Sequence, residues 1–362
     1  MTAGLRPNPL LSWDSQFMPI FNPGLFSVDT LNNLQQFDVG VGYLFERGHK
    51  RQRRLDAARD QTRVTQELVF DAERALKFNV AQQFINALLA KSNLAFAHKA
   101  LNSFQQTVKI NEERYKAGDI SQGDLLKTKI QLLQFQTDVT TAELAKVQAL
   151  ASLRQLIGYD AVPRDYEVIG DLEYAPVRVR LDDLEATALR ERSDLRAAQR
   201  AVNAAQSQSN LAKANGKQDL NVSFDFSHVS ANSSSSMFFN IPLAVFNRNQ
   251  GEIARTRYAL HQAELNQKAS EQTVLTDVKN AYEAVQTNQE VVDLYQTGYL
   301  KQAQESRDIS EFAYKQGAAA LLDFLDAERS YRATQLAYRQ ALAAHMLSLE
   351  QLRQAVGARM LP

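Results

Sequence analysis

The sequence predicts a mainly α-helical protein with a small β part, built from two structurally similar halves. Three observations lead to this fold class. Residues 111–158 and 310–357 align without a gap, which indicates an internal duplication. A long stretch that is almost free of Gly and Pro precedes each copy, as in long helices. Segments in which apolar and polar residues alternate come before those stretches, as in β-strands.

The composition limits the classes of function. The chain has 362 residues, with 41 Lys and Arg against 41 Asp and Glu, so its balanced charge gives no argument for a nucleic-acid partner. Because cysteine is absent, disulfides, thiolate metal sites and a cysteine nucleophile are excluded. No apolar run reaches about eighteen residues, and the first residues, MTAGLRPNPLLSW, show no signal-peptide pattern.

The repeat places identical residues at matching points of the two halves. The aligned pairs include Glu112/Glu311, Tyr115/Tyr314, Lys116/Lys315, Gly118/Gly317, Asp124/Asp323 and Leu126/Leu325. A repeat of this length is too long for a short-repeat solenoid, so it predicts two halves of one architecture.

Each half is expected to contain a long helical hairpin. Residues 49–117 contain no Gly or Pro and are rich in Ala, Gln, Arg, Glu and Leu, which predicts a helix of about 100 Å. Residues 252–316 form the equivalent, interrupted only by Gly298. Gly118 and Gly317 are the predicted turns, and the returning helices are expected at 121–157 and 319–356. Helices this long must pack beside other long helices, as in coiled coils.

Strand patterns occur at the far end of these helices. Residues 37–45 and 220–227 alternate apolar with polar or glycine residues, and 238–246 is expected to continue the second pattern after a polar loop at 230–237. With a less regular strand in residues 9–21, the sequence predicts two β-hairpins, one per half. A strand with one apolar face and one small, polar face suits a membrane β-barrel. Four strands cannot close a barrel, but three chains would supply twelve.

The expected order of segments follows from these patterns. It is a first β-hairpin (1–47), a first long helical hairpin (48–157), a mixed connector (158–193), a helix (194–217), a second β-hairpin (218–247), a second long helical hairpin (248–357) and a tail (358–362). Helix is expected to resume near 181–215 with a break at 192–194, and short β-like runs are expected in the connector.

These segments together resemble the TolC-type outer-membrane efflux family. The resemblance rests on ERYKAGDISQGDLL and FAYKQGAAALLDFLDAERS at the turns, on YLFERGHKRQ and AVFNRNQGEIA after the strands, and on the half-ends LRQLIG and LRQAVG. It covers essentially the whole chain. The segment AGLRPNP is similar to members that serve pumps of the resistance-nodulation-division type, which export metal ions or drugs.

The resemblance implies a homotrimer in the outer membrane of a Gram-negative bacterium. Its twelve-stranded β-barrel and its periplasmic tube of helical hairpins would form a passive duct that docks on a periplasmic adaptor protein and an inner-membrane pump. A helix and a signal peptide before the first strand are also implied, and we expect both to lie outside this sequence. A type I secretion channel and a soluble coiled-coil scaffold remain alternatives.

The resemblance also implies roles for particular residues. Asp323 and Asp326 would form acidic rings that narrow the periplasmic mouth, and Tyr314 and Asp124 would link neighbouring hairpins in the closed state. The basic linking residue of the family is replaced by Ala319. Gly118 and Gly317 mark the tips that face the adaptor.

Structural interpretations of these residues stay open. Ser121 could cap the returning helix with Asp124 in its first turn, and Tyr314 could be a packed coiled-coil residue. The basic run at 46–59 could be a solvated helix face or could contact anionic lipid headgroups. The predicted aromatic residues at the membrane interface are Trp13, Tyr43, Phe45 and Phe246.

The sequence predicts no enzyme and no cofactor. The five His residues are scattered along the chain, and no two of them have the helical spacing of a metal-ligand pair. The pattern GVG at 40–42 lies within a predicted strand and is not a phosphate loop.

Overall fold

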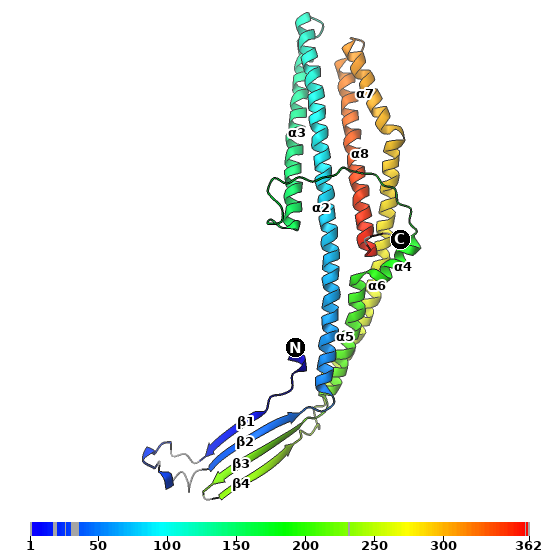
Figure 1. Ribbon diagram of the computed structural model, residues 1–362. Coiled ribbons are helices and arrows are strands. Elements are labelled where there is room, and N and C mark those ends of the chain that lie inside the picture. Colours follow the sequence, from blue (N-terminus) through cyan, green and yellow to red (C-terminus); the bar gives the residue numbers. More distant parts are fainter. Residues whose placement is uncertain are drawn as a thin grey trace. The chain divides into compact units, whose positions relative to one another are not determined.

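The computed structural model describes residues 2–16, 20–25, 27–29, 36–230, 232–358 and 360. These residues form long helices and a four-stranded antiparallel sheet, which confirms the predicted fold class (Figure 1). The chain divides into two compact units. The first contains Met1–Leu68 and Asp194–Ser270, and the second contains Val69–Ser193 and Glu271–Pro362.

The sheet of the first unit contains strands β1 (Leu10–Gln16), β2 (Gln36–Phe45), β3 (Leu220–Val229) and β4 (Asn232–Asn240) in that order. Both predicted hairpins are therefore present. They are joined by antiparallel pairing of β2 with β3, from Gln36 opposite Val229 to Phe45 opposite Leu220. Part of the predicted first hairpin, residues 17–19, 26 and 30–35, lies outside the described residues.

The predicted position of the fourth strand was wrong. Residues 230–237 were expected to be a loop, but β4 begins at Asn232, directly opposite Val229, so only two residues remain for the turn. Ser230 has a φ of +55°, the left-handed conformation that tight hairpin turns need. Backbone hydrogen bonds to β3 hold the serine-rich residues 233–236 in the sheet, and this pairing does not depend on their side chains. The strand ends before Pro242, which has no N–H group to donate.

Three helices complete the first unit: the beginning of α2 (Lys50–Ala117), α5 (Ser193–Asn215) and the beginning of α6 (Gln250–Leu294). Small buried residues such as Ala57, Ala204 and Ala212 allow close packing. Polar contacts also join α5 to α2, since Arg196 pairs with Glu67 at 3.0 Å.

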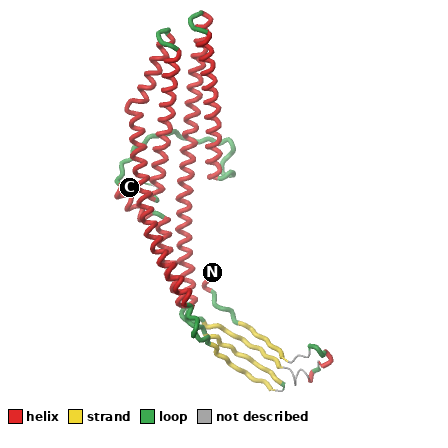
Figure 2. The backbone as a smooth tube through the Cα atoms, turned by 180° about the vertical axis from the view of Figure 1, so that it is seen from behind, coloured by secondary structure: helices red, strands yellow, loops and turns green. Residues whose placement is uncertain are grey.

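The second unit contains two helical hairpins. The rest of α2 pairs with α3 (Gln122–Ile157), and α7 (Leu300–Lys315) pairs with α8 (Leu321–Val356). Both views show α2 lying between α3 and α8, with α7 on the far side of α8 (Figures 1 and 2). A five-residue π-helix, η3 (Tyr295–Tyr299), joins α6 to α7 at the predicted interruption, Gly298. A π-bulge of this kind typically bends a helix.

The connector differs from its prediction. Residues 158–180 are all described and contain no strand, so the expected β-like runs were wrong. Instead of pairing with another strand, the connector binds helices. Its Val168 carbonyl accepts from Lys91 at 3.1 Å, and its Tyr174 hydroxyl donates to Asp293 at 2.6 Å. The short apolar runs of the connector therefore lie across the helices, because the connector packs against helices and not beside the edge of a sheet.

The predicted helix break at 192–194 is confirmed. A single residue, Arg192, separates helix α4 (Leu181–Glu191) from α5. Arg192 between them is 3% exposed, and its guanidinium donates to Asp277 at 2.9 Å and to the Ala355 carbonyl at 3.2 Å. No described helix combines the length and the apolar character needed to cross a membrane.

Candidate functional site

The two hairpin tips have the geometry that the repeat predicts. Gly118 and Gly317 have φ values of +84° and +74°. Each glycine N–H donates to the carbonyl three residues earlier, and the next N–H, of Asp119 or Ala318, donates to the carbonyl five residues earlier. Left-handed glycines with these bonds end helices, so the glycines are required by the turn itself.

The aspartate that follows the first tip takes part in a helix cap. The Ser121 hydroxyl accepts from the Asp124 N–H at 3.0 Å and donates to the Asp124 carboxylate at 2.8 Å. Lys127 lies 3.8 Å from the same carboxylate. The helix-start interpretation of Asp124 is therefore observed.

The aspartates that follow the second tip differ from each other. The Asp323 carboxylate accepts from the Ala320 N–H at 3.3 Å, so it caps the start of α8. Asp326 lies one turn later, is exposed, and pairs with Arg329. Arg329, which the sequence pattern did not single out, offsets part of the charge of Asp326.

Both aspartates line a groove between α3 and α8. The groove has a volume of about 800 Å³, and its other charged lining residues are Asp138, Glu328, Arg329 and Arg332. The structure thus brings Asp323 and Asp326 to one open surface. Acidic side chains outnumber basic ones among these lining residues, although Asp138, Asp326 and Glu328 are each paired with an arginine.

Tyr314 is buried and connects three helices. Its hydroxyl donates to the Asn111 side chain at 3.0 Å. Asn111 donates to Thr128 at 3.0 Å, and Thr128 donates to the Asp124 carbonyl at 2.8 Å. Within this chain, Tyr314 therefore reaches the backbone of Asp124 through two buried polar residues, while the Asp124 carboxylate binds Ser121.

Asn111 and Thr128 were missed by the sequence analysis. Both are completely buried, and Asn111 follows Phe104 and Val108 at the helical spacing of one face. That spacing was the available signal for a polar residue within the seam between hairpins.

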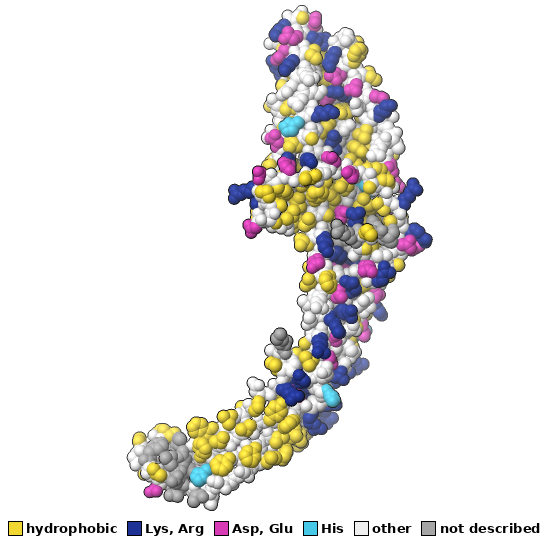
Figure 3. Space-filling model, in the orientation of Figure 1, with side chains coloured by type: hydrophobic (Ala, Val, Ile, Leu, Met, Phe, Trp, Pro, Cys, Tyr) yellow, Lys and Arg dark blue, Asp and Glu magenta, His cyan; other side chains and the backbone are white. Residues whose placement is uncertain are grey.

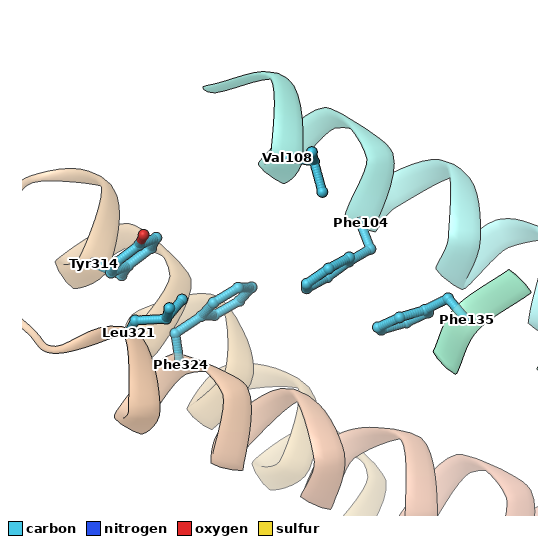
Figure 4. Close-up of a cluster of buried hydrophobic side chains, with 6 residues drawn as sticks. All are labelled: Phe104, Val108, Phe135, Tyr314, Leu321 and Phe324. Atoms are coloured by element: carbon cyan, nitrogen blue, oxygen red, sulfur yellow. The ribbon is translucent and has the colours of Figure 1, made fainter. Parts of the chain in front are cut away.

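We call the hydrogen-bonded chain from Tyr314 through Asn111 and Thr128 the buried relay. It lies against an apolar cluster. Figure 4 shows the rings of Phe104 and Phe135 stacked, with centroids 4.5 Å apart, and the ring of Tyr314 parallel to that of Phe324 at 5.6 Å. Burial raises the pKa of the Tyr314 hydroxyl, although the bond to Asn111 and the charge of Arg114 oppose this effect. The phenol therefore remains a neutral donor.

An ionic cluster joins the same helices. Arg307 on α7 donates to the buried Glu328 on α8 at 2.9 Å and to Ser103 on α2 at 3.1 Å. Burial alone would lower the pKa of Arg307, but hydrogen bonds to Asp308 and Glu328 raise it above its ordinary value. Arg307 therefore stays charged and holds the α7–α8 hairpin against α2.

The sheet separates its side chains by polarity. One face carries Trp13, Val41, Phe224 and Phe226, which are 69%, 51%, 50% and 41% exposed. The opposite face carries mostly small and polar residues, with Leu10, Leu44 and Phe238 as exceptions. A Cβ on Gly40, which lies on this face, would be 1.9 Å from the Asp225 carboxylate. Hydrophobic side chains gather visibly over the sheet in Figure 3.

The predicted aromatic interface residues lie on or near this sheet. Trp13 packs edge-on against Phe37 with ring centroids 5.8 Å apart, and Tyr43 packs against Phe45 at 4.9 Å. Phe246 lies beyond β4 and is 92% exposed. In the described part of the chain, no three His, Asp or Glu side chains are arranged to hold a metal ion.

The chain resembles known proteins along most of its length. The outer membrane efflux protein family matches residues 29–159 and 184–358. The chain belongs to that family. The matched ranges include both helical hairpins, both glycine tips and three of the four strands.

Named relatives within the family include metal-efflux proteins. The chain is 26% identical over 292 residues to the cation efflux system protein CusC of Escherichia coli K12, which covers 77% of this chain and 63% of CusC. The chain thus spans less than two thirds of the length of CusC. It is 25% identical over 327 residues to the cobalt-zinc-cadmium resistance protein CzcC of Cupriavidus metallidurans, covering 88% of this chain and 76% of CzcC.

Solved structures support the same fold for this member of the outer membrane efflux protein family. A crystal structure of CusC matches with a TM-score of 0.80 at 20% identity, covering 99% of this chain and 84% of that chain. The CmeC outer membrane channel of Campylobacter jejuni matches with a TM-score of 0.78 at 15% identity, covering 98% and 78%.

Proposed function

We propose that the chain forms a passive outer-membrane channel of a tripartite efflux system. Three chains would close a twelve-stranded barrel and a tube of helical hairpins, and the tube would meet a periplasmic adaptor and an inner-membrane pump. The observation that carries this proposal is the sheet, whose apolar face is exposed while its opposite face is mostly small and polar. A membrane barrel needs lipid on one side of each strand and water on the other.

A soluble scaffold explains the sheet less well. Such a protein would leave Leu11, Trp13, Phe224 and Phe239 exposed to water, each at least 50%. Exposed apolar surfaces of this extent usually mark a protein or membrane contact.

Metal cations are the substrate class we favour. CusC is named as part of a cation efflux system, and CzcC is named for resistance to cobalt, zinc and cadmium. The acidic surface that includes Asp323 and Asp326 is compatible with the passage of cations. Drugs and other small molecules are the alternative substrates, and the proposed pump would choose between them. The proposal includes no catalytic step.

The roles of single residues complete the proposal. Asp323 and Asp326 narrow the mouth, Tyr314 and Asp124 take part in its closed state, and Gly118 and Gly317 shape the tips that meet the adaptor. The membrane-interface residues are Trp13, Tyr43, Phe45 and Phe246. The trimer places three copies of each residue around one axis.

Removing the charge of the mouth should lower its preference for cations. The variant Asp323→Asn with Asp326→Asn keeps an oxygen that can accept from the Ala320 N–H, so the helix cap survives. Single-channel recording should show a lower ratio of cation to anion permeability and weaker block by multivalent cations.

The matched control is Asp182→Asn with Asp183→Asn, which removes two exposed charges from the start of α4. This control should leave selectivity unchanged. If the mouth variant assembles normally and keeps the selectivity of the parent, Asp323 and Asp326 do not line the conducting path.

Loss of the Tyr314 hydroxyl should loosen the closed mouth. Tyr314→Phe leaves the buried Asn111 oxygen without its donor, at a cost of about 1–3 kcal/mol in the free energy of unfolding. Because the folded pKa of Tyr314 is raised, its hydroxyl contributes fully below about pH 10 and less as the pH rises beyond that value. The variant should show higher single-channel conductance with unchanged ion selectivity.

Tyr299→Phe is the control, because Tyr299 is 60% exposed on η3. An equal rise in conductance in both variants would show that the buried relay does not hold the mouth closed.

A further inference from the structure

An aromatic residue followed two positions later by an arginine occurs just before each long helix. Phe45 and Arg47 precede α2, and Phe246 and Arg248 precede α6. Phe45 is 50% exposed and Phe246 is 92% exposed, and both arginines are exposed. The two halves therefore repeat one sequence arrangement, in which an exposed aromatic residue is followed two positions later by an exposed arginine.

Two close contacts bring these segments together in the first unit. A Cβ on Gly48 would lie 2.7 Å from the Lys217 side chain, and a Cβ on Gly216 would lie 2.6 Å from the Arg248 carbonyl. The turn at 216–217 thus packs against the segments that lead into α2 and α6. Exposed basic residues surround this point, and we call five of them the basic collar: Arg47, Arg53, Lys213, Lys217 and Arg248.

The nearby carboxylates already have partners. Asp219 accepts from Lys50 at 2.7 Å and from the Arg47 N–H at 2.9 Å. Glu46 pairs with Arg54. Glu252 pairs with Arg255 at 2.6 Å.

The basic collar itself lacks such neutralisation. Across the described ranges, no carboxylate lies within ion-pair distance of its five side chains. The surface therefore has an excess of positive charge directly beside the apolar face of the sheet. Figure 3 shows Lys and Arg side chains gathered where the helices meet the sheet.

We propose that the basic collar binds the phosphate groups of anionic phospholipids, while Phe45 and Phe246 enter the adjoining acyl-chain region. This inference rests on the proposed function, which places the apolar face of the sheet in lipid. Arginine can donate two parallel hydrogen bonds to a phosphate, and aromatic rings favour the boundary between headgroups and acyl chains. The repeated arrangement fixes the depth of both halves at one level of the membrane.

The test measures lipid binding to the full chain in a neutral detergent by native mass spectrometry. Short-chain phosphatidylglycerol and phosphatidylcholine are titrated separately at low salt. Phosphatidylglycerol should bind more tightly. The variant Arg47→Gln with Arg53→Gln and Arg248→Gln should weaken its binding by roughly five-fold for each charge removed, about a hundred-fold in total.

Two control variants separate charge position from total charge. Lys77→Gln with Arg190→Gln and Lys301→Gln removes three exposed charges from the second unit and should leave binding unchanged. Replacing the three collar arginines by Lys should keep most of the affinity, because a positive charge remains at each position.

Three results would overturn the inference: equal binding of the two lipids, unchanged binding to the Gln variant, or displacement of phosphatidylglycerol by an equal concentration of inorganic phosphate. The last result would indicate a site for free anions. Channel conductance, recorded in parallel, tests the proposed function separately. If the protein conducts ions but the Gln variant binds lipid as well as the parent does, only the lipid-binding role of the basic collar is rejected. If lipid binding depends on the basic collar but no conductance is measured, only the channel function is rejected.

Discussion

Arginine at position 224 should destabilise the protein folded in a lipid bilayer by about 2–4 kcal/mol. Phe224 lies on the apolar face of β3, between Val41 of β2 and Met237 of β4, and is 50% exposed. If this face meets lipid, the substitution moves a guanidinium into hydrocarbon. Equilibrium unfolding in urea, with the protein folded into phospholipid vesicles, measures the change.

The control is Ser236→Arg on β4, where alternation places the side chain on the opposite, polar face. Ser236 is exposed and lies directly across from Asp225, so a positive charge there is close to a carboxylate. We expect a change within about 0.5 kcal/mol, as for ordinary surface substitutions. Equal destabilisation by both variants would show that the two faces of the sheet do not meet lipid and water.

Truncation of Phe135 should destabilise the second unit by about 3–5 kcal/mol. Phe135 is 1% exposed, stacks on Phe104, and lies under the Arg332 guanidinium at 4.1 Å from its centroid. Phe135→Ala removes the buried ring, its stacking on Phe104 and its contact with Arg332. It leaves a cavity between α2, α3 and α8. Loss of helical circular dichroism in a denaturant titration reports the change.

Leu133→Ala is the matched comparison, since Leu133 lies on the same helix and is 62% exposed. It should change the free energy of unfolding by less than about 0.5 kcal/mol in an isolated chain. If Leu133→Ala lowers the free energy of unfolding only in the trimer, then the face of α3 that carries Leu133 contacts a neighbouring chain. A small effect of Phe135→Ala would mean that the seam is not a closely packed core.

The helices could be predicted from the sequence because their signals are local. The absence of Gly and Pro between 49 and 117 predicts α2 to within one residue, and the repeated glycines predict both tips. Helix formation and left-handed glycine turns depend on residues a few positions apart. Alternation likewise predicted β2 and β3, together with the polarity of their faces.

The misplacement of β4 shows where local signals stop. Serines 233–236 have no strand pattern of their own, and they join the sheet because β3 offers a free edge directly across a two-residue turn. The connector shows the reverse case, where apolar residues with a strand-like pattern meet helices and form no strand. Which partner a segment meets is a property of the tertiary structure.

The candidate site divides in the same way. The sequence by itself determined the duplicated hairpins, the positions of Asp124 and Asp323 in the first turns of their helices, and the apolar and polar faces of β2 and β3, because each depends on spacing along the chain. Only the tertiary structure decided that Tyr314 binds Asn111 and that Asp219, near the basic collar, is neutralised by Lys50. The Tyr314–Asn111 and Lys50–Asp219 contacts join residues far apart in sequence, so their geometry exists only once the helices and strands have packed.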